Sequence, residues 1–133
     1  MSYKTGFVKK HQDVLEKLAS ETDMRCYGSD NEMYQAGEFP CLGLFMAEAS
    51  INLESRSYVE LEYLFLFGVF EEYDRDDPLS QKAIQYSTYE TLVDVIDKMK
   101  FEIASNPETM TGLAFSNGSF VSGWTVFVKY NAQ

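Results

Sequence analysis

The chain has 133 residues, of which 45% are hydrophobic and 15% are aromatic. This length suits one domain spanning residues 1–133, and the composition favours a packed core over disorder. Lys and Arg total 11 against 21 Asp and Glu, so the formal net charge is −10. Such acidity disfavours non-specific attraction to nucleic acid or to an anionic membrane, and we expect neither as a partner.

Two further features bear on the compartment. The segment MSYKTGFVKKHQ has no apolar stretch typical of a secretory signal, and no window reaches the roughly 18 apolar residues of a membrane span. We therefore expect a soluble protein that is made inside the cell. Cys26 and Cys41 lack the spacing of a metal or redox motif, so free thiols are the default expectation and a Cys26–Cys41 disulfide is the alternative.

The first predicted element is a helix over residues 8–20. Its apolar positions Val8, Val14, Leu15 and Leu18 share one face, and the sole histidine, His11, falls on a part that looks exposed. Four lysines make this helix the one basic region of the chain, and they predict either a solvated face or an intermolecular contact. These are Lys4, Lys9, Lys10 and Lys17.

The middle of the chain predicts strands. A short strand over 24–27 and an exposed loop to residue 38 precede a strand over 39–49, with Pro40 near its start. Residues 58–73, YVELEYLFLFGVFEEY, predict a long strand in which apolar side chains from position 59 to 69 alternate on one face. Glu60 and Glu62 open the other face. At about 3.3 Å per residue this strand spans roughly 50 Å, so we expect a long antiparallel hairpin that projects past the body.

An acidic run leads into the second predicted helix. Asp77 is placed to cap it and Pro78 occupies its first position, and the helix is predicted to reach about residue 104. Its apolar face is predicted to consist of Tyr89, Leu92, Val93, Ile96, Met99 and Ile103.

The last predicted element is a hairpin with strands over 112–116 and 119–130 around the turn Asn117-Gly118, with a bulge or bend at Gly123. The order of elements predicts an α+β domain. We expect an antiparallel sheet of four or five strands with a long β-hairpin and two helices packed on one face.

The sequence has no constellation of catalytic residues. His11 has no evident nucleophile beside it, and no glycine-rich phosphate loop precedes a helix. Asp74, Asp76 and Asp77 lack the glycine and glutamate of the helix-loop-helix calcium pattern, so a solvated turn with capping acids is favoured over a calcium site. Glu60 and Glu62 favour solvation or an interface contact over acid–base catalysis. We therefore expect a non-enzyme without a cofactor or a metal.

The order and size of four segments resemble the tail terminator or tail completion proteins of long-tailed bacteriophages. These segments are FPCLGLFMAEA, YVELEYLFLFGVF, DPLSQKAIQYSTYETLVDVIDKM and GSFVSGWTVFVKY. The resemblance implies a structural virion protein at the tail end or head–tail junction. It implies an oligomeric ring, commonly a hexamer, that terminates the tail tube and contacts tube and neck or connector proteins. It supplies no catalytic residue.

A ring requires unlike surfaces that meet between neighbouring subunits. We expect one such surface at Lys9 and Lys10 and the other at Asp74, Asp76 and Asp77, with Glu60 and Glu62 as further interface candidates. The alternative function is a non-enzymatic interaction adaptor or inhibitor. A small-molecule enzyme with a cleft under a helix is a third hypothesis.

Overall fold

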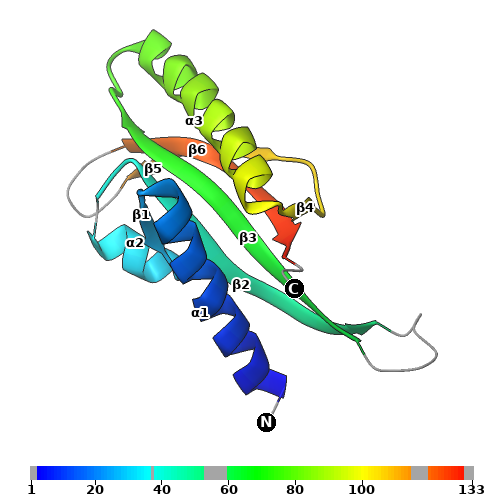
Figure 1. Cartoon of the computed structure of the whole chain (residues 1–133). Helices are drawn as coiled ribbons and strands as arrows, with labels where there is room; N and C mark the ends of the chain where they lie inside the picture. Colours follow the sequence, from blue (N-terminus) through cyan, green and yellow to red (C-terminus); the bar gives the residue numbers. More distant parts are fainter. Residues whose placement is uncertain (1–2, 37, 53–59, 115–119, 131–133) are drawn as a thin grey trace.

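A mixed sheet of six strands forms the centre of the structure, a computed structural model that describes residues 3–36, 38–52, 60–114 and 120–130 (Figure 1). The strand order is β1-β2-β3-β6-β4, and β5 also pairs with β6. In chain order the elements are α1 (Tyr3–Thr22), β1 (Arg25–Tyr27), α2 (Asp30–Ala36), β2 (Cys41–Asn52), β3 (Glu60–Tyr73), α3 (Pro78–Met99), β4 (Glu102–Ile103), β5 (Glu108–Ala114) and β6 (Phe120–Lys129).

The α+β class is confirmed, but the prediction of a purely antiparallel sheet of four or five strands is wrong. β1 runs parallel to β2, with Arg25 opposite Cys41 and Tyr27 opposite Gly43. A parallel pair requires a crossover connection, and α2 lies within the connection between these two strands. The two-residue strand β4 adds a further member on the other side of the sheet.

The long hairpin is present as β2 and β3. Their register runs from Cys41 opposite Phe70 to Asn52 opposite Glu60, with one irregularity between Met46 and Glu48. β6 pairs with β3 from Leu64 onward, so residues 60–63 and the facing part of β2 extend past β6 as a two-stranded ribbon. Figure 1 shows this ribbon leaving the body at the lower right. Residues 58–59 of the predicted strand lie outside the described residues.

The main core lies between one sheet face and the helices α1 and α3, so the prediction of two helices on one face is correct. The buried side chains are Val14 and Leu18 from α1, Leu42 and Leu44 from β2, Phe65, Phe67 and Val69 from β3, Leu92, Val95 and Met99 from α3, Phe101, and Val126, Val128 and Tyr130 at the C-terminal end. The alternation predicted for β3 therefore places its aromatic residues where expected.

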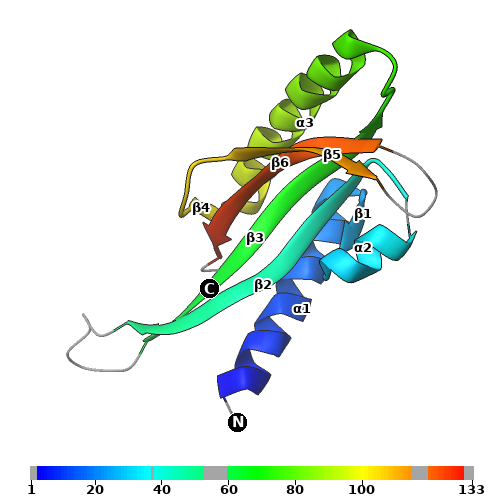
Figure 2. The same ribbon diagram turned by 180° about the vertical axis from the view of Figure 1, so that it is seen from behind.

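The opposite face is covered at one end by α2 (Figure 2), in a segment that was predicted to be an exposed loop. That prediction is wrong because Met33 is fully buried against Cys41 and Phe70. The backbone N–H of Glu32 donates to Ser29 Oγ at 3.1 Å, which caps the start of this helix. A short helix can thus bury one residue and half-bury a second, here Tyr34, while Asp30, Asn31 and Glu32 stay exposed.

Helix α3 begins as predicted and ends earlier than predicted. The N–H of Leu79 donates to Asp77 Oδ1 at 3.0 Å, and Pro78 takes the first position. The helix stops at Met99 because Lys100 adopts the left-handed conformation, with φ of 58°, and its N–H donates to the Asp97 carbonyl. The expected continuation to residue 104 is wrong, and Ile103 lies in β4.

The predicted C-terminal hairpin corresponds to β5 and β6, and its Asn117-Gly118 turn lies outside the described residues. The ladder irregularity lies in β5, between Met110 and Leu113, beside Gly123 of β6. The backbone of Gly123 lies so close to β3 that a Cβ at this position would overlap the carbonyl oxygen of Val69. Only glycine, which has no Cβ, fits between the two strands here.

Candidate functional site

His11 packs into the interior, so the expectation that it lies on an exposed part of the helix is wrong. Its side chain is 7% exposed, and Nε2 lies 2.6 Å from the carbonyl oxygen of Leu44. The ring is 5.9 Å from that of Phe65, and a Cβ at Gly28 would come within 3.0 Å of His11 Cε1. These contacts assign His11 to packing between α1 and the edge of β2.

The lysines of α1 divide into two groups. Lys10 and Lys17 turn towards Tyr130, with Nζ atoms 5.2 Å and 5.5 Å from its ring centroid. Lys17 Nζ also donates to the Tyr130 hydroxyl at 2.9 Å, and this hydrogen bond raises the pKa of Lys17. Lys9 is exposed, whereas the side chain of Lys4 lies outside the described residues. Lys10 and Lys17 therefore hold Tyr130, the residue after β6, against α1 through cation–π contacts.

The acidic candidates lie in the turn between β3 and α3. Asp74 Oδ1 accepts from the N–H of Asp76 at 3.0 Å, and Asp77 caps α3. This turn and the N-terminal end of α1 lie at opposite ends of the molecule (Figure 1), so the structure does not bring Lys9 near Asp76 within one subunit. Glu60 and Glu62 belong to the projecting ribbon, and their side chains lie outside the described residues.

The cysteines are free thiols on neighbouring strands. Cys26 packs against the core under α1 and α3, whereas Cys41 belongs to the cluster under α2 on the other face. Burial raises the pKa of the Cys41 thiol to about 12. The disulfide alternative is therefore not realised. Among the residues whose side chains are placed, no group of three or more His, Cys, Asp or Glu side chains is arranged to hold a metal ion.

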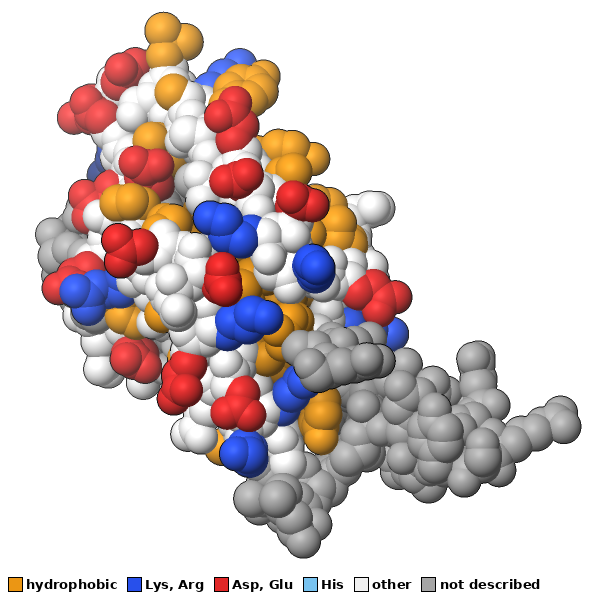
Figure 3. All heavy atoms as spheres, viewed as in Figure 1, with side chains coloured by type: hydrophobic (Ala, Val, Ile, Leu, Met, Phe, Trp, Pro, Cys, Tyr) orange, Lys and Arg blue, Asp and Glu red, His pale blue; other side chains and the backbone are white. Residues whose placement is uncertain are grey.

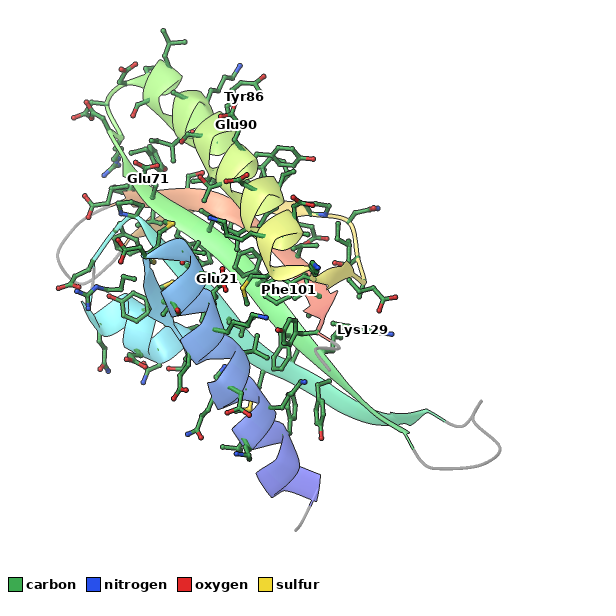
Figure 4. The ribbon with its side chains drawn as sticks, in the orientation of Figure 1. Glu21, Glu71, Tyr86, Glu90, Phe101 and Lys129 are labelled. Atoms are coloured by element: carbon green, nitrogen blue, oxygen red, sulfur yellow. The ribbon has the colours of Figure 1, made fainter. Side chains whose placement is uncertain are left out.

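An exposed apolar stripe runs along α3. It consists of Leu79 (75% exposed), Tyr86 (75%), Tyr89 (41%) and Val93 (50%), and we call it the α3 stripe. Figure 3 shows hydrophobic side chains along this edge of the helix, and Figure 4 shows Tyr86 and Glu90 on its outer side. The predicted apolar face is thus partly wrong, because Val93 and Ile103 are half-exposed while Leu92 and Met99 are buried.

A groove of about 590 Å³ follows the α3 stripe on the side of β5. Its walls are Tyr86 and Tyr89 on the helix and Pro107 and Thr109 on the other side, with Trp124 between them. Trp124 Nε1 donates to the carbonyl of Gln85 at 2.8 Å, and its ring meets that of Tyr89 at 4.9 Å. The lining of this groove is therefore largely aromatic and apolar, with Lys82, Gln85 and Thr109 as its polar members.

A second apolar surface lies on the sheet face away from α1 and α3. Phe45 of β2 is opposite Leu66 of β3, which in turn is opposite Phe127 of β6, and we call these three residues the far-face row. Phe127 is 38% exposed, and Leu66 is partly exposed. Phe45 borders the cluster under α2, but in the described part of the chain Leu66 and Phe127 belong to neither buried cluster.

Neither apolar surface was predicted from the sequence. The spacing of Leu79, Tyr86 and Val93 at seven-residue intervals is the signal that could have indicated the α3 stripe. Within the described residues, no helix combines the length and apolar character needed to cross a bilayer. Searches against protein-family models and against curated protein sequences each returned no match.

Proposed function

We propose that this chain is a structural protein of a bacteriophage virion, at the tail end or head–tail junction, where it forms a ring that terminates the tail tube. The observation that carries the proposal is the ribbon of β2 and β3, which extends past the pairing limit of β6 at Leu64. A small domain has no need of this extension for its own core, whereas a ring subunit can use it to reach a neighbour or the tube.

The proposed role is non-enzymatic and uses no cofactor. The titratable residues selected from the sequence have local structural contacts that support this: His11 meets the Leu44 carbonyl, and Asp77 caps α3. The partners in this proposal are further copies of the chain, commonly six in a ring, together with the tail tube and neck or connector proteins.

The charged surfaces of the proposed ring lie on different subunits. Lys9 and Lys10 at one end of the molecule would approach Asp74, Asp76 and Asp77 at the opposite end of the next copy, in a head-to-tail contact. Lys9 is the better placed of the two lysines, since Lys10 already lies over Tyr130. Such exposed pairs weaken with salt, because the screening length is about 10 Å at 0.1 M.

Light scattering over a range of protein concentrations, with and without tail tube protein, tests the ring. We expect an oligomer whose fraction falls when Lys9 and Lys10 are both changed to Glu. Asp76→Lys in the same chain should restore part of it, and it leaves the α3 cap at Asp77 in place. Gln12→Glu, at another exposed position of α1, is the matched control for added negative charge. A monomer at every concentration, alone and with the tube protein, would refute the ring.

The second candidate function is an interaction adaptor or inhibitor. The exposed aromatic residues of the α3 stripe favour it, since aromatic side chains are enriched where partners bind. An adaptor would remain monomeric until it met its partner, so the same light-scattering series separates the two functions.

A further inference from the structure

Helix α3 has more apolar surface than its own sheet covers. Its buried side is formed by Thr88, Leu92, Val95 and Met99. At about 100° per residue, Val93 lies roughly a quarter turn from Leu92, and Tyr86 and Tyr89 lie on the same side as Val93. A surface helix needs an apolar arc of about 100°, and the two sets together cover about twice that. The α3 stripe is therefore a second contact face rather than the margin of the core.

The neighbours of α3 leave this second face open. On one flank Lys98 Nζ reaches the carbonyl of Glu21 at 3.5 Å, at the C-terminal end of α1. On the other flank the groove beside Pro107 and Thr109 separates the helix from β5.

The sheet face that carries the far-face row is apolar and extends beyond the part that α2 covers. A sheet whose two faces are both apolar requires a layer on each face. α1 and α3 cover one face. In the part of the chain that the structure describes, α2 covers the other face over the cluster of Cys41, Phe70 and Val121, whose margin reaches Phe45 but not Leu66 or Phe127. Beside the row, the rings of Phe45 and Phe70 lie over Gly43 and Gly68, which have no side chains of their own. Phe45, Leu66 and Phe127 therefore form an apolar row across three neighbouring strands, at the margin of the part that α2 covers.

We propose that the α3 stripe of one copy packs on the far-face row of the next copy. This inference rests on the proposed ring and identifies its apolar contact. A helix on a sheet is the packing that this chain already uses on its other face, so one subunit supplies both halves of the contact. Because the two surfaces are different, each bound copy leaves one of each for a further neighbour, and the contact can propagate until a ring closes.

Charges flanking the two surfaces are complementary. On α3, Lys82 and Glu90 lie on either side of Tyr86 along the helix, about 12 Å apart at 1.5 Å per residue. On the far face Lys129 of β6 and Glu108 of β5, which is opposite Thr125, flank Phe127. From position 125 to 129 the strand rises about 13 Å. One orientation of the helix on the strand therefore brings Lys82 near Glu108 and Glu90 near Lys129 of the next copy.

The exposed area suits the centre of an interface. At about 200 Å² for each aromatic side chain, Tyr86 and Tyr89 together leave roughly 230 Å² in contact with solvent. A stable interface buries about 800 Å² per partner, of which a few aromatic residues carry most of the affinity. The two tyrosines can serve as that centre, with the groove and the charged pairs around them.

Two variants test the contact separately and in a mixture. The stripe variant combines Tyr86→Arg with Val93→Arg, and the row variant is Phe127→Arg. All three positions are at least 38% exposed, and far-UV circular dichroism checks that each variant folds. If Phe127→Arg does not fold, Thr125→Arg replaces it at a polar position of the same face. Ser87→Arg, exposed on α3 about 100° around the helix from Tyr86, is the control.

We expect each variant alone to associate at least about tenfold more weakly than the wild type, and the control to be unchanged. An equimolar mixture should form dimers and nothing larger, because the intact row of the stripe variant can accept the intact stripe of the row variant. Light scattering measures both results. A mixture that stays monomeric overturns this contact, as do variants that assemble like the wild type, and in both cases the ring itself stands. A monomeric wild type, with and without tail tube protein, overturns the ring and this contact together.

Discussion

Adding a single methyl group at Gly123 should destabilise the protein strongly. The Cβ of an alanine would lie 2.9 Å from the carbonyl carbon of Val69 and 3.1 Å from the Cα of Phe70, besides overlapping the Val69 oxygen. All of these are backbone atoms of β3, so no side chain can move aside. Because a carbon approaches a carbonyl oxygen to only about 3.3–3.6 Å, β3 and β6 must separate at this point.

The expected magnitude follows from the hydrogen bonds in this ladder. Separation would break two or three backbone hydrogen bonds around Gly123, and each buried group left without a partner costs about 1–3 kcal/mol. We expect a loss of about 3–5 kcal/mol in the free energy of unfolding, a large share of the roughly 5–15 kcal/mol typical of a domain. The melting temperature should fall by about 10 °C or more.

Urea unfolding followed by circular dichroism measures this loss, and Gly6→Ala is the matched control. There the added methyl group meets only the Tyr63 hydroxyl, at 3.3 Å, and a side-chain tip can shift. Since alanine is favoured over glycine in a helix by up to about 1 kcal/mol, Gly6→Ala should be neutral or stabilising. A Gly123→Ala protein within about 1 kcal/mol of the wild type would refute the close approach of β3 and β6.

Three further predictions concern single side chains. His11→Ala should lower the free energy of unfolding by about 2–4 kcal/mol, since it leaves a cavity and an unpaired Leu44 carbonyl, and an unchanged urea midpoint would contradict that packing. Asp77→Ala should cost about 1 kcal/mol by removing the α3 cap, whereas Asp76→Ala should change the midpoint little, and equal effects would rule out a specific cap. Burial raises the pKa of the Cys41 thiol to about 12 from an ordinary 9.0. The neutral thiol therefore contributes fully to the free energy of unfolding below pH 9, and this contribution is lost as pH rises towards 12. Urea unfolding at neutral pH and near pH 10 should show that the free energy of unfolding falls less in Cys41→Ala than in the wild type, and equal falls would contradict the shift.

The parts of the fold that could be predicted from sequence are those set by local chemistry. Asp77 followed by Pro78 marks a helix start wherever the rest of the chain lies, because capping uses backbone groups two residues away. The alternation along β3 identifies its buried face because successive side chains of a strand point to opposite sides.

Other features depended on contacts between distant segments. β1 has three residues, and nothing within them indicates that they pair parallel to β2. α3 has two apolar stripes at helical spacing, and the sequence alone does not say which one the sheet covers. The end of α3 depended on the left-handed conformation of Lys100, which is not a glycine.

For His11 and for α2, the spacing of residues in the sequence already indicates the structure that is observed. His11 lies three and seven residues before Val14 and Leu18, and therefore on the buried side of α1. Ser29 is followed three residues later by Glu32, a spacing typical of a helix start, and α2 begins there. Histidine and short polar segments are typical of exposed positions, but the spacing of these residues indicates a buried His11 and a capped helix.

The continuation of the ribbon into the centre of the sheet has a mechanical consequence. Eleven residue pairs join β2 to β3, and a pull directed along these strands loads their hydrogen bonds together, in shear. β1 is held to β2 by three pairs at the edge, which a sideways pull can peel apart one after another. Under load, β2, β3 and β6 should therefore stay joined longest, and the first strand to detach should be β1, which only three pairs hold to the sheet.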